Sequence, residues 1–221
     1  MTSTTSLIIE LILCVLTQIF LYRRYKTLGL YIHIIICLIL TGIMSLKTST
    51  LYNFDINLGI IPFVTIFTST NILIQKNGEN TIKNLLLTTL ATFLISYIIL
   101  YLVQMMNLSN INLYTNSAYD NIFEESLRMY FTNFVTILYS LLLNAKLYYY
   151  LKKTKNNIII SNIFSTIIIQ FLSSILFGLI AYAFIKEPID IIKIIMIRYL
   201  ISLIVGILET ISIYTTKKVT E

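Results

Sequence analysis

The sequence predicts an all-helical polytopic membrane protein, a bundle of about six or seven transmembrane helices. Hydrophobic residues make up 57% of the 221-residue chain and charged residues only 12%, and the mean hydropathy is +0.84. Soluble domains carry a charge at roughly a quarter of their positions. A helix needs about 20 apolar residues to cross a bilayer core, and long stretches lack any Asp, Glu, Lys or Arg. These stretches are 27–46, 56–75, 84–119, 129–145 and 156–185.

We expect seven helices in one transmembrane domain that occupies residues 1–221. The chain lacks the polar–apolar alternation of barrel strands, and backbone groups in lipid must be satisfied internally, so the spans are predicted to be helices. Two apolar stretches flank the uncharged ones; the first contains Glu10, and the last contains Arg198 and Glu209. The predicted spans are 6–22, 28–46, 57–75, 82–105, 127–150, 157–185 and 189–215.

The first span is predicted to be retained rather than cleaved as a signal peptide. It has no basic start, contains Glu10, and runs into Arg23 and Arg24 instead of a small-residue cleavage site. In the second span, His33 and Cys37 lie four residues apart and so share one helical face. A Cys–His pair is the minimum for a thiol nucleophile, but no acidic residue lies nearby in the sequence to orient the imidazole. We expect packing and a hydrogen-bonded histidine there.

The third span contains Pro62, one of the two prolines in the chain. Proline removes an amide donor and opens a helix locally, and hydroxyl residues that follow it can bond back to the freed carbonyls. Interrupted helices often line transport sites, because irregular backbone at this depth must face a cavity or other protein. The sequence leaves two alternatives open: an interrupted helix at a binding site, or a kink close to the membrane surface. Asn77-Gly78 then predicts a turn.

The later spans differ in their polar content. The fourth is almost purely apolar, and the polar connection after it, about 106–126, is too short to form a further domain. The fifth contains Asn144 and ends in three consecutive tyrosines, a pattern typical of an interfacial aromatic belt. The sixth carries Gln170 among small hydroxyl residues, which let helices approach closely.

Basic residues are distributed unevenly between alternating loops, which predicts the topology. One side collects Arg23, Arg24, Lys26, Lys76, Lys83, Lys146, Lys152, Lys153, Lys155, Lys217 and Lys218; the other has Lys47, Arg128, Lys186 and Lys193 with most of the acidic residues. We expect a multi-pass protein of the cell membrane. Because short cytoplasmic loops are enriched in Lys and Arg, its C-terminus is predicted to lie in the cytoplasm and, with seven spans, its N-terminus outside. The net charge of +6 therefore reflects topology, and nucleic-acid binding is not implied.

Polar residues inside the spans are the candidates for function. Charges in lipid are costly and usually face a cavity or a partner. Arg198 and Glu209 lie about three turns apart on one helix face, too far to pair directly, so each needs another helix or water. Amides that converge on a cavity would suit a planar, hydrogen-bonding solute such as a nucleobase. The charges are Glu10, Arg128, Arg198 and Glu209, and the amides are Asn71, Gln75, Asn133, Asn144 and Gln170.

Four groups of residues, taken in order, carry a resemblance to a known family over about residues 58–218. They are Ile61-Pro62-Phe63 with Thr70-Asn71, Gln75 and Asn77-Gly78; Leu127-Arg128 through Asn144 to Leu151-Lys152; Ser165-Thr166 with Gln170; and Tyr199 through Glu209-Thr210 to Tyr214. In order and spacing they resemble the queuosine precursor transporter family, also catalogued as the vitamin uptake transporter (VUT) family. The resemblance implies an importer of 7-deazaguanine precursors of the tRNA nucleoside queuosine.

The chain departs from this family mainly by losing acidic residues. Asn71 and Asn144 stand where the family has aspartate, and Gln75 where it often has glutamate. Ser173 replaces a further aspartate, Ser202 a lysine and Ile211 a proline, whereas Arg128, Ser165, Thr166 and Gln170 are kept and Glu209 is a conservative change. An amide accepts fewer and weaker hydrogen bonds from a guanine-like edge than a carboxylate does. A changed substrate, a changed coupling ion or a loss of transport are the open alternatives.

We therefore expect a transporter, neither an enzyme nor a cofactor-dependent protein, because no catalytic motif, phosphate loop or metal cluster is present. The resemblance implies a small 7-deazaguanine-like solute held by Asn71, Gln75, Arg128, Asn144, Gln170 and Glu209. Three rival classes remain: a substrate-capturing subunit that needs partner ATPases, a structural or regulatory membrane protein, and, least favoured, an intramembrane Cys/His peptidase. The sequence leaves the exact substrate, the coupling ion and the oligomeric state open.

Overall fold

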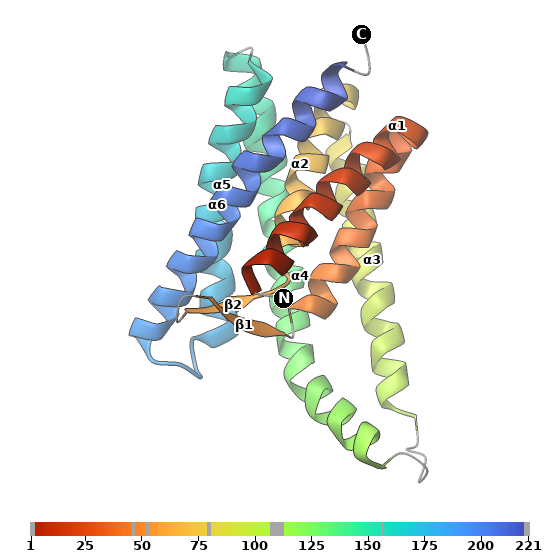
Figure 1. Cartoon of the computed structure of the whole chain (residues 1–221). Helices are drawn as coiled ribbons and strands as arrows, with labels where there is room; N and C mark the ends of the chain where they lie inside the picture. The colour runs from red at the N-terminus through yellow and green to blue at the C-terminus, as the bar shows by residue number, and fades with distance from the viewer. Residues whose placement is uncertain are drawn as a thin grey trace.

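The computed structural model of the chain describes residues 3–45, 47–51, 54–78, 81–106, 113–155 and 157–218. Within these residues it contains six helices and one short two-stranded sheet (Figure 1). In chain order the elements are α1 (Ser3–Met44), β1 (Thr48–Leu51), β2 (Phe54–Asn57), α2 (Ile60–Asn77), α3 (Thr81–Gln104), α4 (Leu113–Lys155), α5 (Ile158–Tyr182) and α6 (Pro188–Lys218).

The helix α1 consists of two arms joined at Lys26. This residue has φ 53° and ψ −129°, a backbone conformation that residues other than glycine rarely adopt. The chain reverses there, and the red and orange arms of α1 run back along each other in Figure 1. The two arms correspond to the predicted spans 6–22 and 28–46.

Glycine is required three residues after this turn. A Cβ atom on Gly29 would lie 2.0 Å from the carbonyl oxygen of Leu21 in the first arm. Because that neighbour is backbone, it cannot move aside as a side chain would, so the two arms pack closely only with glycine at this position.

A short antiparallel hairpin that the sequence did not predict follows α1, with Thr48 of β1 opposite Asn57 of β2. Gly59 then caps α2, and Pro62 falls in the first turn, where the first amides of a helix have no partner within it. Of the two alternatives that the sequence left open, the interrupted helix is therefore wrong: α2 is continuous to Asn77. A hydroxyl does bond back to the backbone after the proline, but the acceptor is not a freed carbonyl: Thr65 Oγ1 donates to the carbonyl oxygen of Pro62 itself at 2.9 Å.

The helix α2 is the central element of the bundle. Every residue from Ile60 to Ile74 is buried, and α2 contacts each of the other helices. It runs between α1 on one side and the α5–α6 pair on the other (Figure 1). The predicted turn at Asn77-Gly78 is confirmed, because Gly78 has φ 74° and its amide donates to the Ile74 carbonyl oxygen at 2.9 Å.

The later helices follow the predicted spans, with one correction. The helix α4 begins at Leu113, well before residue 127, so part of the connection expected over 106–126 is helical. The helix α5 is capped by Asn157, whose side-chain oxygen accepts the amides of Ile159 and Ile160. Pro188 opens α6 at a position where its missing amide donor costs little.

The outer surfaces of the bundle are apolar, as a lipid environment requires. Five helices are long and apolar enough to cross a membrane: α1, α3, the part of α4 from Arg128, α5 and α6. Large apolar side chains on α3, such as Leu87 and Ile95, are more than half exposed. The chain is thus a multi-pass membrane protein built as a helical bundle, in which α2, buried from Ile60 to Ile74, is enclosed by the other helices.

Lys26→Gly should stabilise the protein by about 1 kcal/mol, because glycine adopts the turn conformation without the strain that a side chain brings. Equilibrium unfolding by SDS in mixed micelles, followed by tyrosine fluorescence, measures the change. Lys26→Ala is the matched control: it removes the same charge and keeps the strain, so it should bring no gain. Equal stabilisation by both variants would contradict the strained turn.

Candidate functional site

Buried amides form a hydrogen-bonded chain across four helices. Asn144 Nδ2 on α4 donates to Asn71 Oδ1 on α2 at 2.7 Å. Asn71 Nδ2 donates to Asn162 Oδ1 on α5, also at 2.7 Å. Asn162 Nδ2 then donates to Thr210 Oγ1 on α6 at 3.1 Å. We call these four residues the amide chain; it joins Asn71 and Asn144, both expected at the site, through direct contact.

Close packing of α5 against α6 brings the last link within reach. A Cβ atom on Gly206 would lie 2.4 Å from Thr166 Cγ2 on α5, so glycine lets the two helices approach. Thr210 Oγ1 also donates to the Gly206 carbonyl oxygen at 3.1 Å, which orients its lone pairs toward the Asn162 amide. The fully buried Asn162 is thereby held between α2 and α6.

Glu209 directly precedes Thr210, the last member of the amide chain, and is fully buried. Thr68 Oγ1 on α2 donates to Glu209 Oε2 at 2.7 Å. The requirement for a partner from another helix is therefore met for Glu209, and α2 supplies it.

The other expected site residues lie at different depths. Gln170 on α5 is fully buried; its Oε1 accepts from Ser173 Oγ at 3.3 Å, and its Nε2 has no hydrogen-bond partner among the described residues. Gln75 is half-buried near the end of α2, where Lys152 Nζ donates to its backbone carbonyl at 3.2 Å. Arg128 is exposed and lies at a pocket near the β1–β2 hairpin.

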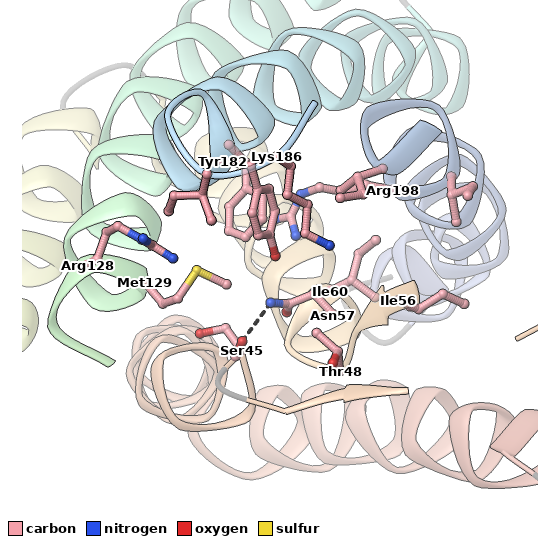
Figure 2. Close-up of a pocket in the computed structure, with 14 residues that line it drawn as sticks. Ser45, Thr48, Ile56, Asn57, Ile60, Arg128, Met129, Tyr182, Lys186 and Arg198 are labelled. Atoms are coloured by element: carbon pink, nitrogen blue, oxygen red, sulfur yellow. Dashed lines mark hydrogen bonds between the residues drawn. The ribbon is translucent and has the colours of Figure 1, made fainter. Parts of the chain in front are cut away.

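This pocket, here called the basic pocket, has a volume of about 320 Å³. Its lining includes Asn57 at the end of β2, Arg128 on α4, Tyr182 at the end of α5, Lys186 just after it, and Arg198 on α6. The hairpin lies at the end of the bundle away from the C-terminal end of α6 (Figure 1). In Figure 2 the three basic side chains reach toward the same space from separate segments.

The guanidinium of Arg198 is held between two aromatic rings. Its Cζ lies 3.8 Å from the ring centre of Phe177 and 4.8 Å from that of Phe63. The side chain is only 5% exposed, and none of its three guanidinium nitrogens has a hydrogen-bond partner among the described residues. The rings cover the faces of the guanidinium, so its in-plane N–H groups remain available for acceptors.

One side of the basic pocket is fixed by hydrogen bonds of two asparagine side chains. Asn57 Nδ2 donates to the Ser45 carbonyl oxygen at 2.7 Å, drawn as a dashed line in Figure 2, and Asn57 Oδ1 accepts the Gly59 amide at 3.0 Å. Asn133 on α4 in turn donates to Ser45 Oγ. The hairpin therefore closes one side of the pocket by tying the end of α1 to the start of α2.

His33 and Cys37 lie in a separate buried cluster on α1 and α2. His33 Nδ1 lies 2.9 Å from Ser69 Oγ and Nε2 lies 3.2 Å from the Cys14 carbonyl oxygen, so we assign the proton to Nε2. Cys37 Sγ lies 3.5 Å from His33 Nε2 and 3.2 Å from Thr65 Oγ1. Both ring nitrogens are engaged in helix packing, as expected for a hydrogen-bonded histidine. Among the described residues, no three His, Cys, Asp or Glu side chains group as metal ligands.

Sequence reasoning missed two parts of this arrangement. Asn162 was visible as an amide in a charge-free stretch, which is the signal that identified Asn71, but it was not placed among the binding residues. The predicted topology placed Arg128 and Lys186 on one side of the membrane, but it did not place Arg198, which lies inside a span, with them. That the three line one pocket is seen only in the fold.

Comparison with known proteins identifies the class. Residues 57–216 match the family described as "Putative vitamin uptake transporter". The match spans well over half of the chain, so the protein belongs to the vitamin uptake transporter family and is a membrane transporter by class. No curated protein and no solved structure matches the chain.

Breaking the amide chain should reveal direct coupling between Asn71 and Asn144. In a double-mutant cycle of the two alanine substitutions, we expect a coupling of about 0.6 to 1.5 kcal/mol, the range of hydrogen bonds between transmembrane helices. Unfolding in SDS measures it. Asn71 with Asn133 is the matched pair: both are buried amides, but they share no partner, so their coupling should be close to zero. Additive losses of unfolding free energy for the Asn71 and Asn144 substitutions would contradict the direct hydrogen bond between them.

Proposed function

We propose that the protein imports a small planar solute of the nucleobase type, with 7-deazaguanine precursors of queuosine as the first candidates. Membership of a transporter family supports transport as the class of activity. The observation that carries the solute class is the amide chain, in which the fully buried Asn71, Asn144 and Asn162 are joined by direct hydrogen bonds between helices.

Amides are suited to such a solute because each offers both a donor and an acceptor. The edge of a purine-like base alternates the same two groups, so it can replace one amide partner with no loss in the number of hydrogen bonds. Asn144 Oδ1 and Gln170 Nε2, a buried acceptor and a buried donor, have no hydrogen-bond partners among the described residues. A solute that satisfied them would remove the cost of leaving polar groups unpaired in a water-free interior.

The distribution of basic residues supports an orientation with the C-terminus in the cytoplasm. The basic pocket would then open to the outside, since it lies at the opposite end of the bundle from the end of α6. Solute would enter at the basic pocket and be handed to the amide chain, with Arg128 at the outer mouth and Gln75 toward the inner one. Glu209, beside the chain, would balance charge at the centre.

Uptake in a strain that neither makes queuosine precursors nor has its own importer tests this function. Wild type should restore queuosine in tRNA at low external 7-cyano- or 7-aminomethyl-7-deazaguanine. Asn71→Ala and Arg128→Ala should lower restoration about tenfold or more while still reaching the membrane, because each removes a group worth at least about 1.4 kcal/mol to the bound solute.

Thr88→Ala is the control for this assay. Thr88 is half-buried on α3, and its hydroxyl donates to the Asn84 carbonyl oxygen within its own helix at 2.8 Å. Full uptake by this variant would show that a lost hydroxyl in a span does not by itself abolish transport. Failure of a well-expressed wild-type protein to restore queuosine would contradict the substrate assignment but not the family membership. Uptake only with an added ATPase partner would indicate a substrate-capturing subunit.

Cys37→Ser should leave uptake unchanged, within about twofold, because serine can keep the contacts with His33 and Thr65 in similar space. The same assay measures it, with membrane abundance followed by immunoblot. Complete loss of function in a well-folded Cys37→Ser variant would instead favour thiol chemistry at this cluster. His33→Gln, which retains a donor and an acceptor, serves as the companion variant.

A further inference from the structure

We propose that the basic pocket is an anion site, and that among planar solutes it favours those with an acidic group over neutral and cationic ones, a carboxylate being the chemistry that fits best. The inference rests on the proposed function in one respect, that the occupant is a transported planar solute. Nothing in the family description specifies a charge for the solute.

The first argument is the charge of the lining. Three cations, Arg128, Lys186 and Arg198, face the pocket, and none of the described lining residues is Asp or Glu. Asp190 lies outside the lining; its Oδ1 is 2.9 Å from Lys193 Nζ, which is its main partner, and its interaction with Lys186 is the weaker one. A pocket with low-dielectric walls and one sign of charge concentrates solutes of the opposite sign and repels those of the same sign.

The second argument is the state of Arg198. This cation is only 5% exposed to solvent, and its guanidinium nitrogens have no acceptor among the described residues. Two phenylalanine rings stabilise the faces of the guanidinium but cannot satisfy its N–H groups. A planar carboxylate can accept two parallel hydrogen bonds from such an edge, and bonds between charged groups are about twice as strong as neutral ones.

The third argument is that two of the pocket's cations are exposed and one is buried. Arg128 and Lys186 are exposed, and Lys186 Nζ lies 5.3 Å from the ring centre of Tyr182. Exposed cations at a mouth attract anions over distance and are screened by salt, whereas the buried Arg198 fixes the bound group. The volume of about 320 Å³ is at the lower end of the range for small-molecule sites and leaves room for a ring beside the acid.

A matched series of solutes tests the proposal. The compounds 7-carboxy-, 7-cyano- and 7-aminomethyl-7-deazaguanine share one ring and differ in charge at one substituent. The purified chain in maltoside micelles, which carry no phosphate or carboxylate, is unfolded by heat in the presence of each. A thiol-reactive dye reports unfolding as Cys14 and Cys37, half-buried and buried in the fold, become exposed. We expect stabilisation in the order acid, then nitrile, then amine.

Variants of Arg198 connect this order to the pocket. Arg198→Gln should weaken binding of the acid on the order of 30-fold, because it removes one partner of a buried charge pair, and should change binding of the nitrile little. Arg198→Lys should recover part of the loss, since lysine restores the charge but lacks the planar fork. Lys193→Gln is the control: this cation on α6 is exposed and outside the pocket, so the response to the acid should persist.

The exposed residues Arg128 and Lys186 keep the test decisive if Arg198→Gln does not fold. Their glutamine variants should weaken the acid response and reduce its dependence on salt. No preference for the acid over the nitrile, or an equal response in wild type and all pocket variants, overturns the anion site. A role of Arg198 in packing alone would lower the melting temperature without changing the order of the solutes.

The outcomes separate this inference from the proposed function. Uptake of the nitrile without tighter binding of the acid overturns the anion site and leaves import of a nucleobase-type solute standing. Stabilisation by benzoate that is lost in Arg198→Gln, with no response to any 7-deazaguanine, supports the anion site and contradicts a solute of the nucleobase type. A response to the acid that disappears when phosphatidylglycerol is added would assign the pocket to a lipid headgroup and overturn the solute assignment.

Discussion

The burial of α2 is the constraint on which the rest of the structure depends. A helix whose residues from Ile60 to Ile74 are all inaccessible has no face on which to leave a polar group unmatched. Its hydroxyls and its amide are therefore each matched within the bundle, and three other helices supply partners. His33 on α1 meets Ser69, Asn144 on α4 meets Asn71, and Glu209 on α6 meets Thr68. These contacts decide which face of each neighbour turns inward.

The two candidate regions differ in how completely their polar groups are satisfied. In the amide chain most groups bond to one another, so a solute must exchange partners there. In the basic pocket, by contrast, Arg198 presents donors with no described acceptor. An unsatisfied cation near an opening favours capture, and a neutral network at the centre favours passage without a deep energy minimum. Whether a polar group is satisfied or left without a partner depends on which groups the fold places opposite one another. The residue types alone are compatible with both states.

The exchange of acids for amides is physically consistent across the bundle. The resemblance to the queuosine precursor transporter family implies aspartates at positions 71 and 144. The Nδ2 of Asn144 lies 2.7 Å from the Oδ1 of Asn71, and two ionised carboxylates at that distance would repel each other strongly in a low-dielectric interior. Two amides instead form a hydrogen bond, and Asn71 still has a donor for Asn162. The paired replacement removes two acids and keeps the helices joined.

Much of the fold was predictable from the sequence, because lipid imposes a length and a polarity on each span. The number and order of the helices, the turn at Gly78 and the need of Glu209 for a partner on another helix all follow from that constraint. The continuous α2 and the β1–β2 hairpin do not, because a proline near a helix start and a four-residue strand have no distinctive signal in an apolar chain. The early start of α4 was hidden by its polar composition.

The sequence by itself determined that polar groups lie in a membrane interior and which residues carry them. Only the tertiary structure decided their partners, since Asn71 and Asn162 are 91 positions apart and Thr68 and Glu209 are 141 apart. The same holds for the basic pocket, where Arg128, Lys186 and Arg198 meet from separate segments. Helix periodicity determines which residues share one face, but the pairing of faces depends on how the helices pack, and that is a property of the whole bundle.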